Sequence, residues 1–453
     1  MFEVKNKENK NYLAKVVVVD KLKPIEGADR IQVAVVDFQD VVVSKQVEQG
    51  DLMVYFPVEC AINKDFLSFT NVFRDPELNA DKESKGFFED KGRVKAIKLM
   101  KGTVKSMGYL VPSMQVAAWA NYDITTKDAG VEFDTISGKL LTQKYVVKKK
   151  EAREKQGKKP QVNRLVDGQV HLHVDTENLR RNAHMIKPTD MISITYKTHG
   201  TSWWTSNVIV KRKLSWIERL LLKLGVKVQE TEHDLVYGSR RVVKNQSFDD
   251  PKQKDHFFGY DLWEDIKNHV GDSIPEGFSL YGEMLGYDKN GGAIQKGYDY
   301  GCVPDGVPFG GPDDVCQSKL EVYRITFTNP DGKVFELTYP QIAEFCERAG
   351  LTPPYLFFWG KAANWLATYG QMSLNEVLEM DIRDFQEKFV STLELAYNDK
   401  PCFMCANEVW EEGIVVRKES LFSCESYKLK SFNFLEHESR VLDSGDEDIE
   451  SIN

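Results

Sequence analysis

The chain has 453 residues, of which 42% are hydrophobic and 28% are charged, and its formal net charge is −9. This length allows two or three domains with separate cores, and the acidic balance argues against a uniformly basic nucleic-acid-binding protein. No apolar run approaches the roughly 20 residues of a membrane span, so we expect no membrane partner. Seven cysteines, and an N-terminus without a signal-like apolar segment, predict reduced thiols and a cytoplasmic protein.

Residues 1–140 are predicted to form a β domain. Apolar segments rich in valine follow one another at short intervals: Tyr12 to Val19, Ile31 to Val35, Val41 to Val43 and Leu52 to Phe56. Short strands separated by polar turns with Asp and Gly are typical of a small β barrel.

Residues 141–185 are predicted to connect this domain to the next one. Between Lys144 and Arg164 there are nine Lys or Arg against two Glu, a local net charge of +7. We interpret this run as a solvated linker, with a phosphate-contacting role as the alternative. His171 and His173 are interpreted as surface or packing side chains, because no further metal ligands lie near them. At the other end of the chain, residues 441–453 are predicted to be an acidic, disordered tail.

Five short elements within residues 186–440, the second predicted domain, are informative through their order. The first is Lys197-Thr198-His199-Gly200, directly after a predicted strand from Ile192 to Tyr196. The others are Ser239-Arg240, Tyr281-Gly282-Glu283, Glu412-Gly413 and the pair Lys428 and Lys430. One short motif means little, but together these supply a nucleophilic lysine, an arginine, two glutamates and a lysine pair. Those are the parts needed to move a nucleoside monophosphate through a covalent Lys–AMP.

The chemistry explains why these residue types are needed. Lys197 must lose its proton before its amine can attack the α-phosphorus of ATP, and nearby cations lower the pKa of an amine. Lys428 and Lys430 are two positions apart in a predicted strand, so their side chains point to the same face. There they would supply the positive charge that lowers the pKa of Lys197, and they would neutralise phosphate oxygens. Arg240 is suited to grip a phosphate through two nitrogens, and Mg²⁺ or Mn²⁺ needs only one or two carboxylates.

These elements resemble motifs I, Ia, III, IV and V of the covalent nucleotidyltransferases, which include ATP-dependent DNA and RNA ligases and mRNA-capping enzymes. The resemblance covers roughly residues 186–435, and His199, where many relatives carry Asp, is similar to the RNA ligases of the Deinococcus/Naegleria type. Residues 24–31, 50–52 and 92–112 also look like the N-terminal OB domain of those ligases. The fold implied is α+β: an OB-like β barrel, then an ATP-grasp-like adenylyltransferase domain with antiparallel sheets and flanking helices.

The resemblance implies a role for each site residue. Lys197 would be the nucleophile, and Glu412, with Glu283, would hold the metal. The residues implied in ATP binding are Lys197, His199, Gly200, Arg240, Glu283, Tyr323, Ile325, Lys428 and Lys430. Ile325 aligns with the aromatic residue that stacks on adenine in relatives, and Tyr323 is the alternative. Arg241 and Glu411 are alternatives to Arg240 and Glu412, one position away in register.

We therefore expect an ATP-dependent RNA ligase that joins a 3′-OH to a 5′-phosphate in RNA or an RNA-containing nicked duplex, acting as a monomer. A DNA ligase and a capping guanylyltransferase use the same lysine chemistry, but both carry an OB domain after motif V. Few residues follow Lys430 and many are acidic, so we expect no such domain there. An OB protein with an inactive transferase domain is the non-enzyme alternative.

Three further segments are predicted to be helical: Ser215 to Leu224, Thr338 to Gly350 and Ser373 to Leu395. The first has apolar residues at helical spacing after a serine N-cap, and we expect it to pack on its own protein rather than on a membrane or partner. Cys402 and Cys405 form a Cys-x-x-Cys pair, but the other cysteines lie at no recognisable zinc spacing, so zinc is not expected there.

Overall fold

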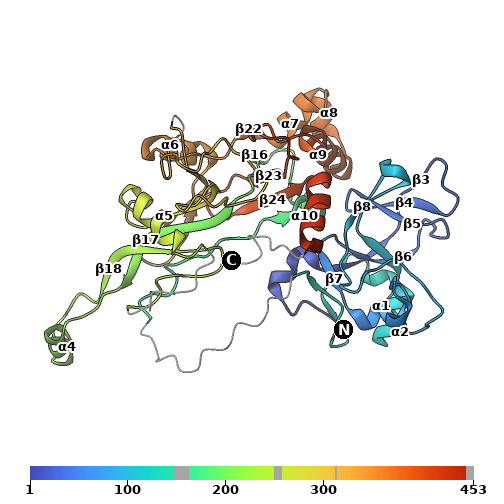
Figure 1. The fold of residues 1–453 in the computed structure, drawn as a ribbon, viewed down its shortest axis with the longest axis horizontal. Coiled ribbons are helices and arrows are strands. Elements are labelled where there is room, and N and C mark those ends of the chain that lie inside the picture. Colours follow the sequence, from blue (N-terminus) through green and yellow to red (C-terminus); the bar gives the residue numbers. More distant parts are fainter. Residues whose placement is uncertain (147–162, 249–257, 312–313, 445–453) are drawn as a thin grey trace.

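The computed structural model describes residues 1–146, 163–248, 258–311 and 314–444. Most of the basic run between Lys144 and Arg164 lies outside the described residues. Of the predicted tail at 441–453, residues 441–444 belong to helix α10 (Phe432–Ser444), and the rest lies outside the described residues. Figure 1 shows the N-terminal strands gathered at one end of the molecule, two larger sheets towards the other, and helix α10 between them.

Short antiparallel strands build the N-terminal region. They form a four-stranded sheet in the order β10-β6-β2-β11, a meander β3-β4-β5, the sheet β1-β12-β13, and the pairs β8-β9 and β14-β7. The bounds are β1 Phe2–Glu3, β2 Ala14–Val18, β3 Leu22–Pro24, β4 Ile31–Val36, β5 Gln39–Ser44, β6 Leu52–Phe56, β7 Cys60–Ile62, β8 Ala96–Leu99, β9 Val104–Met107, β10 Tyr109–Pro112, β11 Glu132–Phe133, β12 Thr135–Ile136, β13 Lys139–Leu140 and β14 Thr142–Lys144. Each of the four strands expected from the sequence is present.

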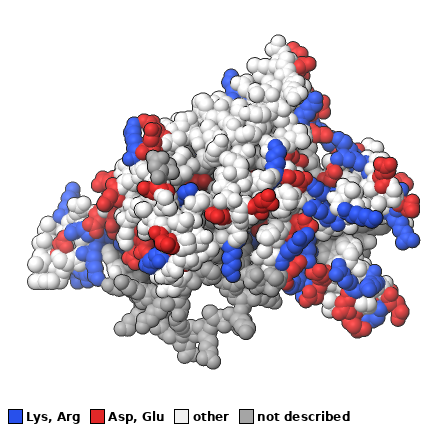
Figure 2. Space-filling model, turned by 45° about the horizontal axis from the view of Figure 1, so that its top comes forward, with Lys and Arg blue, Asp and Glu red and all other residues white. Residues whose placement is uncertain are grey.

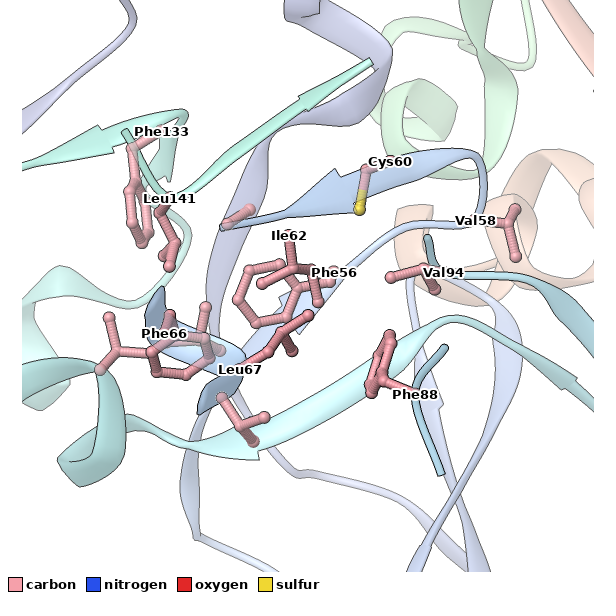
Figure 3. Close-up of a cluster of buried hydrophobic side chains, with 14 of the residues drawn as sticks. Phe56, Val58, Cys60, Ile62, Phe66, Leu67, Phe88, Val94, Phe133 and Leu141 are labelled. Carbon is pink, nitrogen blue, oxygen red and sulfur yellow. The ribbon is translucent and has the colours of Figure 1, made fainter. Parts of the chain in front are cut away.

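Apolar residues of these strands divide between two buried clusters, a smaller one formed with β4 and β5 and a larger one that includes helices α1 and α2. Phe56, Phe66 and Leu67 are fully buried in the larger cluster, and Figure 3 shows Phe56 and Leu67 gathered with Ile62 between the strands and helix α1. The fully buried side chains come from elements far apart in sequence, so burial of apolar area holds the small sheets together.

Two five-stranded sheets form the second region. One has the order β15-β24-β23-β16-β22 and the other β18-β17-β19-β20-β21. The bounds are β15 Glu177–Asn178, β16 Met191–Tyr196, β17 Thr201–Lys211, β18 Thr231–Gly238, β19 Phe278–Gly286, β20 Ser318–Thr328, β21 Val334–Glu336, β22 Leu356–Lys361, β23 Gly413–Lys418 and β24 Glu425–Lys430. All neighbouring pairs are antiparallel except β15 with β24. With the helices below, this confirms the α+β class.

Several helices begin at the polar caps visible in the sequence. Ser215 and Thr338 each form a capping box, with Glu218 and Gln341 respectively, and Gly350 ends α6 in the left-handed region (φ 67°). The bounds are α1 Lys64–Phe69, α2 Ser113–Ala120, α3 Leu179–Asn182, α4 Trp216–Lys223, α5 Leu262–Val270, α6 Tyr339–Ala349, α7 Ala362–Tyr369, α8 Leu374–Glu379, α9 Ile382–Tyr397 and α10 Phe432–Ser444. The segment expected as one helix from Ser373 is two, because the chain is extended at Met380 (ψ 144°) and Asp381 caps α9.

Helix α10 joins the two regions. Its residues Phe432 and Leu435 belong to the N-terminal core, although they follow β24 of the second region directly. Arg93 donates a hydrogen bond to Ser439 Oγ at 2.8 Å, and Lys95 Nζ lies 2.7 Å from Asp443 Oδ2. The last described helix therefore completes the core of the first domain.

Candidate active site

Lys197 lies where the two large sheets meet. It follows the last residue of β16, and residues 197–200 lead directly into β17 of the other sheet. The Lys197 backbone N–H donates a hydrogen bond to the carbonyl oxygen of Gly413 at 2.9 Å, which ties this loop to the start of β23. The first and fourth sequence elements are thus side by side through backbone contacts alone.

The two glycines of these elements are explained by close packing. A Cβ atom at Gly200 would lie 2.3 Å from the carbonyl oxygen of Met284 in β19. At Gly413 the backbone has φ +150°, and a Cβ there would lie 2.0 Å from the carbonyl oxygen of Leu429 in β24. Real side chains do not tolerate such distances, so each glycine lets the loop approach the adjoining strand.

The Lys197 ammonium is paired with a buried carboxylate. Its Nζ lies 2.7 Å from Oε1 of Glu412, which is 1% exposed, whereas the lysine side chain is 19% exposed. On the other side of the carboxylate, His199 Nδ1 lies 3.5 Å from Glu412 Oε2. The His199 backbone N–H donates to the hydroxyl of Tyr300 at 2.7 Å, which fixes the loop. Glu412, rather than Glu411, is the carboxylate beside the lysine.

A cleft opens beside Lys197. Its lining includes five of the residues singled out from the sequence, namely Lys197, Arg240, Glu283, Tyr323 and Lys428. They come from the ends of β16 and β18, from β19 and β20 in one sheet, and from β24 in the other. These residues, far apart along the chain, therefore meet in one place, with three cations and a carboxylate facing a single hollow.

Arg240 is oriented by a residue that the sequence analysis missed. Its Nε and Nη2 lie 2.9 and 2.7 Å from Oδ1 of Asp175, and Arg241 reaches Oδ2 at 3.1 Å. Burial alone would raise the pKa of Asp175, but the arginines and His173 lower it to about 2. Arg240 lines the cleft and Arg241 does not, which favours Arg240 over Arg241 as the phosphate-binding arginine.

His173 has a packing role within the site. Its Nδ1 and the hydroxyl of Tyr323 lie 2.9 Å apart, and both residues line the cleft. His171 bonds instead to the carbonyl oxygen of Gly168 at 2.9 Å. The sequence spacing gave no sign that His173 and Asp175 would lie beside Arg240, because the connecting segment carries no motif.

Two glutamates stand opposite each other on the wall of the cleft. Glu283 lies within β19, paired across strands with Glu321 of β20. Ser202 Oγ donates to Glu283 at 3.1 Å, and Thr198 Oγ1 donates to Glu321 at 2.8 Å. Burial raises the pKa of Glu321 to about 7, although Thr198 and Lys197 both act to lower it. Glu321, preceded and followed by apolar residues, carried no signal in the sequence.

Four residues expected to bind ATP do not line the cleft, namely His199, Gly200, Ile325 and Lys430. Ile325 is fully buried in the core beneath β19 and β20, so Tyr323 is the residue of this pair that reaches the cleft. Lys430 Nζ lies 3.2 Å from Glu59 of the N-terminal region and 3.1 Å from Glu438 of α10. It bridges the two regions, whereas Lys428 faces the cleft.

Glu411, next to Glu412 in the chain, is buried as well, at 1% exposure. Burial, with the neighbouring Cys402, raises the pKa of Glu411 to about 9, so this carboxyl is neutral at physiological pH. The Cys402 backbone N–H bonds to Val409, and the pair Cys402 and Cys405 forms a local turn. Within the described ranges there is no group of three or more His, Cys, Asp or Glu placed to hold a metal.

A family model of an OB-fold domain matches residues 13–113. A variant of the Naegleria gruberi RNA ligase solved with ATP and Mn is similar in structure, with a TM-score of 0.55 and 14% identity, covering 95% of this chain and 99% of that chain. A second variant, solved with AMP and Mn, has a TM-score of 0.54 and 14% identity, and the match covers 94% of this chain and 98% of that chain. The chain has the fold of this RNA ligase. The same ligase with PPi matches with a TM-score of 0.52 and 14% identity over 95% and 99%.

This likeness confirms the fold expected from the sequence, including the OB-fold domain in the N-terminal region. No curated protein sequence matches the chain. In the described parts of the chain, no helix combines the length and apolar character needed to cross a bilayer.

Proposed function

We propose that this protein is an ATP-dependent RNA ligase that seals 3′-OH/5′-phosphate breaks through a covalent lysyl-AMP and an AMP-capped 5′ end. The observation that carries the proposal is the cleft, in which Lys197 stands with Arg240, Glu283 and Lys428. The fold shared with an RNA ligase along nearly the whole of both chains supports it.

In the first step the Lys197 amine attacks the α-phosphorus of ATP, an N–P bond forms, and the bond to pyrophosphate breaks. The lysine must first lose the proton that its ion pair with Glu412 now stabilises. Arg240 and Lys428 bind phosphate oxygens, and their positive charge disfavours the ammonium form of Lys197. Tyr323 lies against the nucleoside and His173 holds its ring in place.

In the second step a 5′-phosphate oxygen of the RNA attacks the same phosphorus, and the Lys197 amine leaves with the electron pair of the N–P bond. The 3′-OH of the adjoining strand then attacks the 5′-phosphorus, its proton passes to solvent, and AMP leaves. Arg240 and Lys428 serve each step because each one develops charge on phosphate oxygens.

A divalent ion suits the donors present, since Glu412 and Glu283 offer the carboxylate oxygens that Mg²⁺ and Mn²⁺ prefer. When bound, such an ion would polarise the phosphoryl oxygens. We assign it to Glu412 first, because that carboxylate already contacts the attacking amine. The N-terminal domain would hold the RNA strands, as OB folds do through basic and aromatic surfaces, and we propose a monomer acting in the cytoplasm.

The proposal is tested by incubating the purified full chain with ATP or GTP labelled at the α-phosphate, with Mg²⁺ or Mn²⁺. We expect label from ATP to stay on the denatured protein, and pyrophosphate to release it when added back. Label retained from GTP only would indicate a capping enzyme, and no label from either nucleotide would contradict the lysine chemistry.

A panel of nicked duplexes then tests the substrate. It varies RNA and DNA on each side of the break, and we expect sealing of nicks that contain RNA. Preference for an all-DNA nick would make the protein a DNA ligase. Adenylylation without sealing of any nick would overturn the ligase assignment while keeping the nucleotide chemistry.

A further inference from the structure

Helix α4 stands at the tip of a hairpin that projects from the body of the protein (Figure 1). Strands β17 and β18 pair from Trp204 with Gly238 to Lys211 with Thr231, and α4 lies in the connection between them. The 11-residue strand β17 begins at the Lys197 loop. At about 3.3 Å per residue it carries the tip roughly 35 Å away from that loop.

The apolar face of α4 is uncovered. None of its residues is buried, and Trp216 is 75% exposed, Ile217 51% and Leu220 50%. Leu224, directly after the helix, is 70% exposed. The expectation that this amphipathic helix packs on its own protein is therefore wrong, because the hairpin carries it beyond reach of the core.

These side chains form one continuous stripe. Trp216, Leu220 and Leu224 follow one another at intervals of four, and Ile217 and Leu221 run beside them, so all five face one side of the helix. Within α4, Leu222 is the apolar residue outside the stripe. An exposed stripe of large apolar side chains is costly in water and marks a contact surface.

Basic residues border the stripe. Residues 211–227 contain six Lys or Arg and one Glu, a net charge of +5 in a chain whose total is −9. Glu218 is already paired with Arg212. Arg219 and Lys223 sit on the helix next to the stripe, where their long side chains can reach past it. In Figure 2 the end of the molecule that carries the hairpin shows a white tip with charged side chains behind it.

We propose that α4 binds the surface of an anionic lipid bilayer and holds the protein there as a peripheral protein. An exposed helix with Trp and Leu on one side and Lys and Arg on the other is the arrangement that lies in a membrane interface. The stripe enters the acyl boundary, and the cations contact phosphate and carboxylate groups of the lipids. This inference is independent of the reaction proposed above, and it revises the expectation of no membrane partner.

A second copy of this chain and an RNA strand are the other candidates to cover the stripe, and both fit its chemistry less well. Two copies would bring two strongly positive tips together, which like charges oppose. RNA would match the cations, but strand-binding surfaces hold bases on aromatic rings, and the stripe is mainly aliphatic with Trp216 as its one ring. A flat, negatively charged surface matches both the charge and the leucines, and a helix at the tip of a long hairpin meets it without obstruction.

The test is cosedimentation of the full chain with vesicles, one set of phosphatidylcholine alone and one in which about a quarter of the lipid is phosphatidylserine. We expect binding to the anionic vesicles only, weakened as salt approaches about 1 M. Leu220→Asp with Leu224→Asp should weaken binding at least about tenfold, since both side chains lose their apolar contact. Leu395→Asp on α9 is the matched control, because Leu395 is 76% exposed outside the hairpin, and it should bind as the wild type does.

Circular dichroism and an unchanged melting temperature show that each variant is folded, whatever the outcome of the labelling assay. No binding of the wild type to anionic vesicles at low salt would overturn the proposal, as would equal binding by the double variant. If vesicles are not bound and the double variant instead loses self-association in sedimentation velocity, the stripe is a contact between copies. If it loses RNA in a mobility-shift assay, the stripe is an RNA surface.

Discussion

The Lys197 cleft and the tip at α4 lie at opposite ends of the same strand, β17, and they depart from the usual distribution of side chains in opposite ways. At the cleft end, charged groups are buried: Glu412 is 1% exposed and Glu283 is 6% exposed. At the tip, Trp216 and Leu224 stand in solvent at 75% and 70% exposure. Burying a charge and exposing a large apolar side chain are both unfavourable.

The difference teaches where each region finds its compensation. At the cleft, each buried charged group has a partner within the protein. Lys197 pairs with Glu412, Arg240 pairs with Asp175, and Glu321 accepts a hydrogen bond from Thr198. The tip has no such partner among the described residues. The charges of the cleft are thus compensated within the protein, whereas the apolar stripe of the tip is covered, in our proposal, by a membrane surface outside it.

The largest expected effect is the loss of covalent labelling when the lysine of the cleft is removed. Lys197→Ala should abolish covalent labelling from ATP, by about a thousandfold or more, as removal of a nucleophile typically does. Lys187→Ala is the control, because it removes an exposed lysine ten positions away, and its labelling should be unchanged. Wild-type labelling of the Lys197 variant would move the nucleophile elsewhere.

A second effect concerns the buried carboxyl of Glu321, whose pKa of about 7 exceeds the ordinary value of 4.5. Below pH 4.5 this group is protonated in both the folded and unfolded chain and costs nothing. As pH rises to 7 the unfolded chain ionises first, so the folded state is disfavoured by up to about 3 kcal/mol above that pH.

Glu321→Gln keeps the acceptor for Thr198 and removes the ionisation. We therefore expect the variant to unfold with a free energy about 3 kcal/mol higher than the wild type at pH 8, and equal at pH 4.5. Denaturant unfolding across that range measures the difference. A gap that does not change with pH would show that the pKa of Glu321 is not raised in the folded protein.

A third prediction contrasts two adjacent carboxyl groups, those of Glu411 and Glu412. Glu412→Gln should lower labelling from ATP about a hundredfold, since it removes the carboxylate beside the attacking amine. Glu411→Gln replaces a carboxyl that is already neutral, its pKa being raised to about 9, and should stay close to wild type. Titration of each variant with Mn²⁺ separates a metal role from a positioning role. The reverse pattern would exchange the two assignments.

The smallest effect is expected at the tip. Leu220→Asp should change the free energy of unfolding by less than about 0.5 kcal/mol, because its side chain has no buried neighbour to lose. Leu280→Ala, in the fully buried core under β19, should cost about 2–5 kcal/mol in the same assay. A large loss at Leu220 would show that the protein does cover this face.

Sequence alone predicted the elements and much of the site, because both have local signals. The caps at Ser215 and Thr338 lie where the helices begin, and Gly200 and Gly413 mark the close approaches. Lys197, Arg240 and Lys428 were found from their chemical types and their order. The likeness in fold to an RNA ligase agrees with that order, while the role of each side chain stays a prediction.

What the sequence did not predict depends on three-dimensional contacts. Asp175 and Glu321 act through partners far along the chain, so no motif announces them. Lys430 satisfies the same alternation as Lys428, but Glu59 and Glu438 hold it at the domain boundary. An amphipathic pattern shows that a helix has an apolar face, and it does not show whether the chain returns to cover that face.

The packing of α10 also sets the order of assembly during synthesis. Phe432 and Leu435 belong to the core that β2, β6 and α1 build near the start of the chain. A ribosome releases those two side chains only after the whole of residues 1–431 has emerged. The N-terminal domain therefore keeps part of its apolar surface open until α10 leaves the ribosome. An interrupted translation product that ends before α10 would expose this gap to chaperones and proteases.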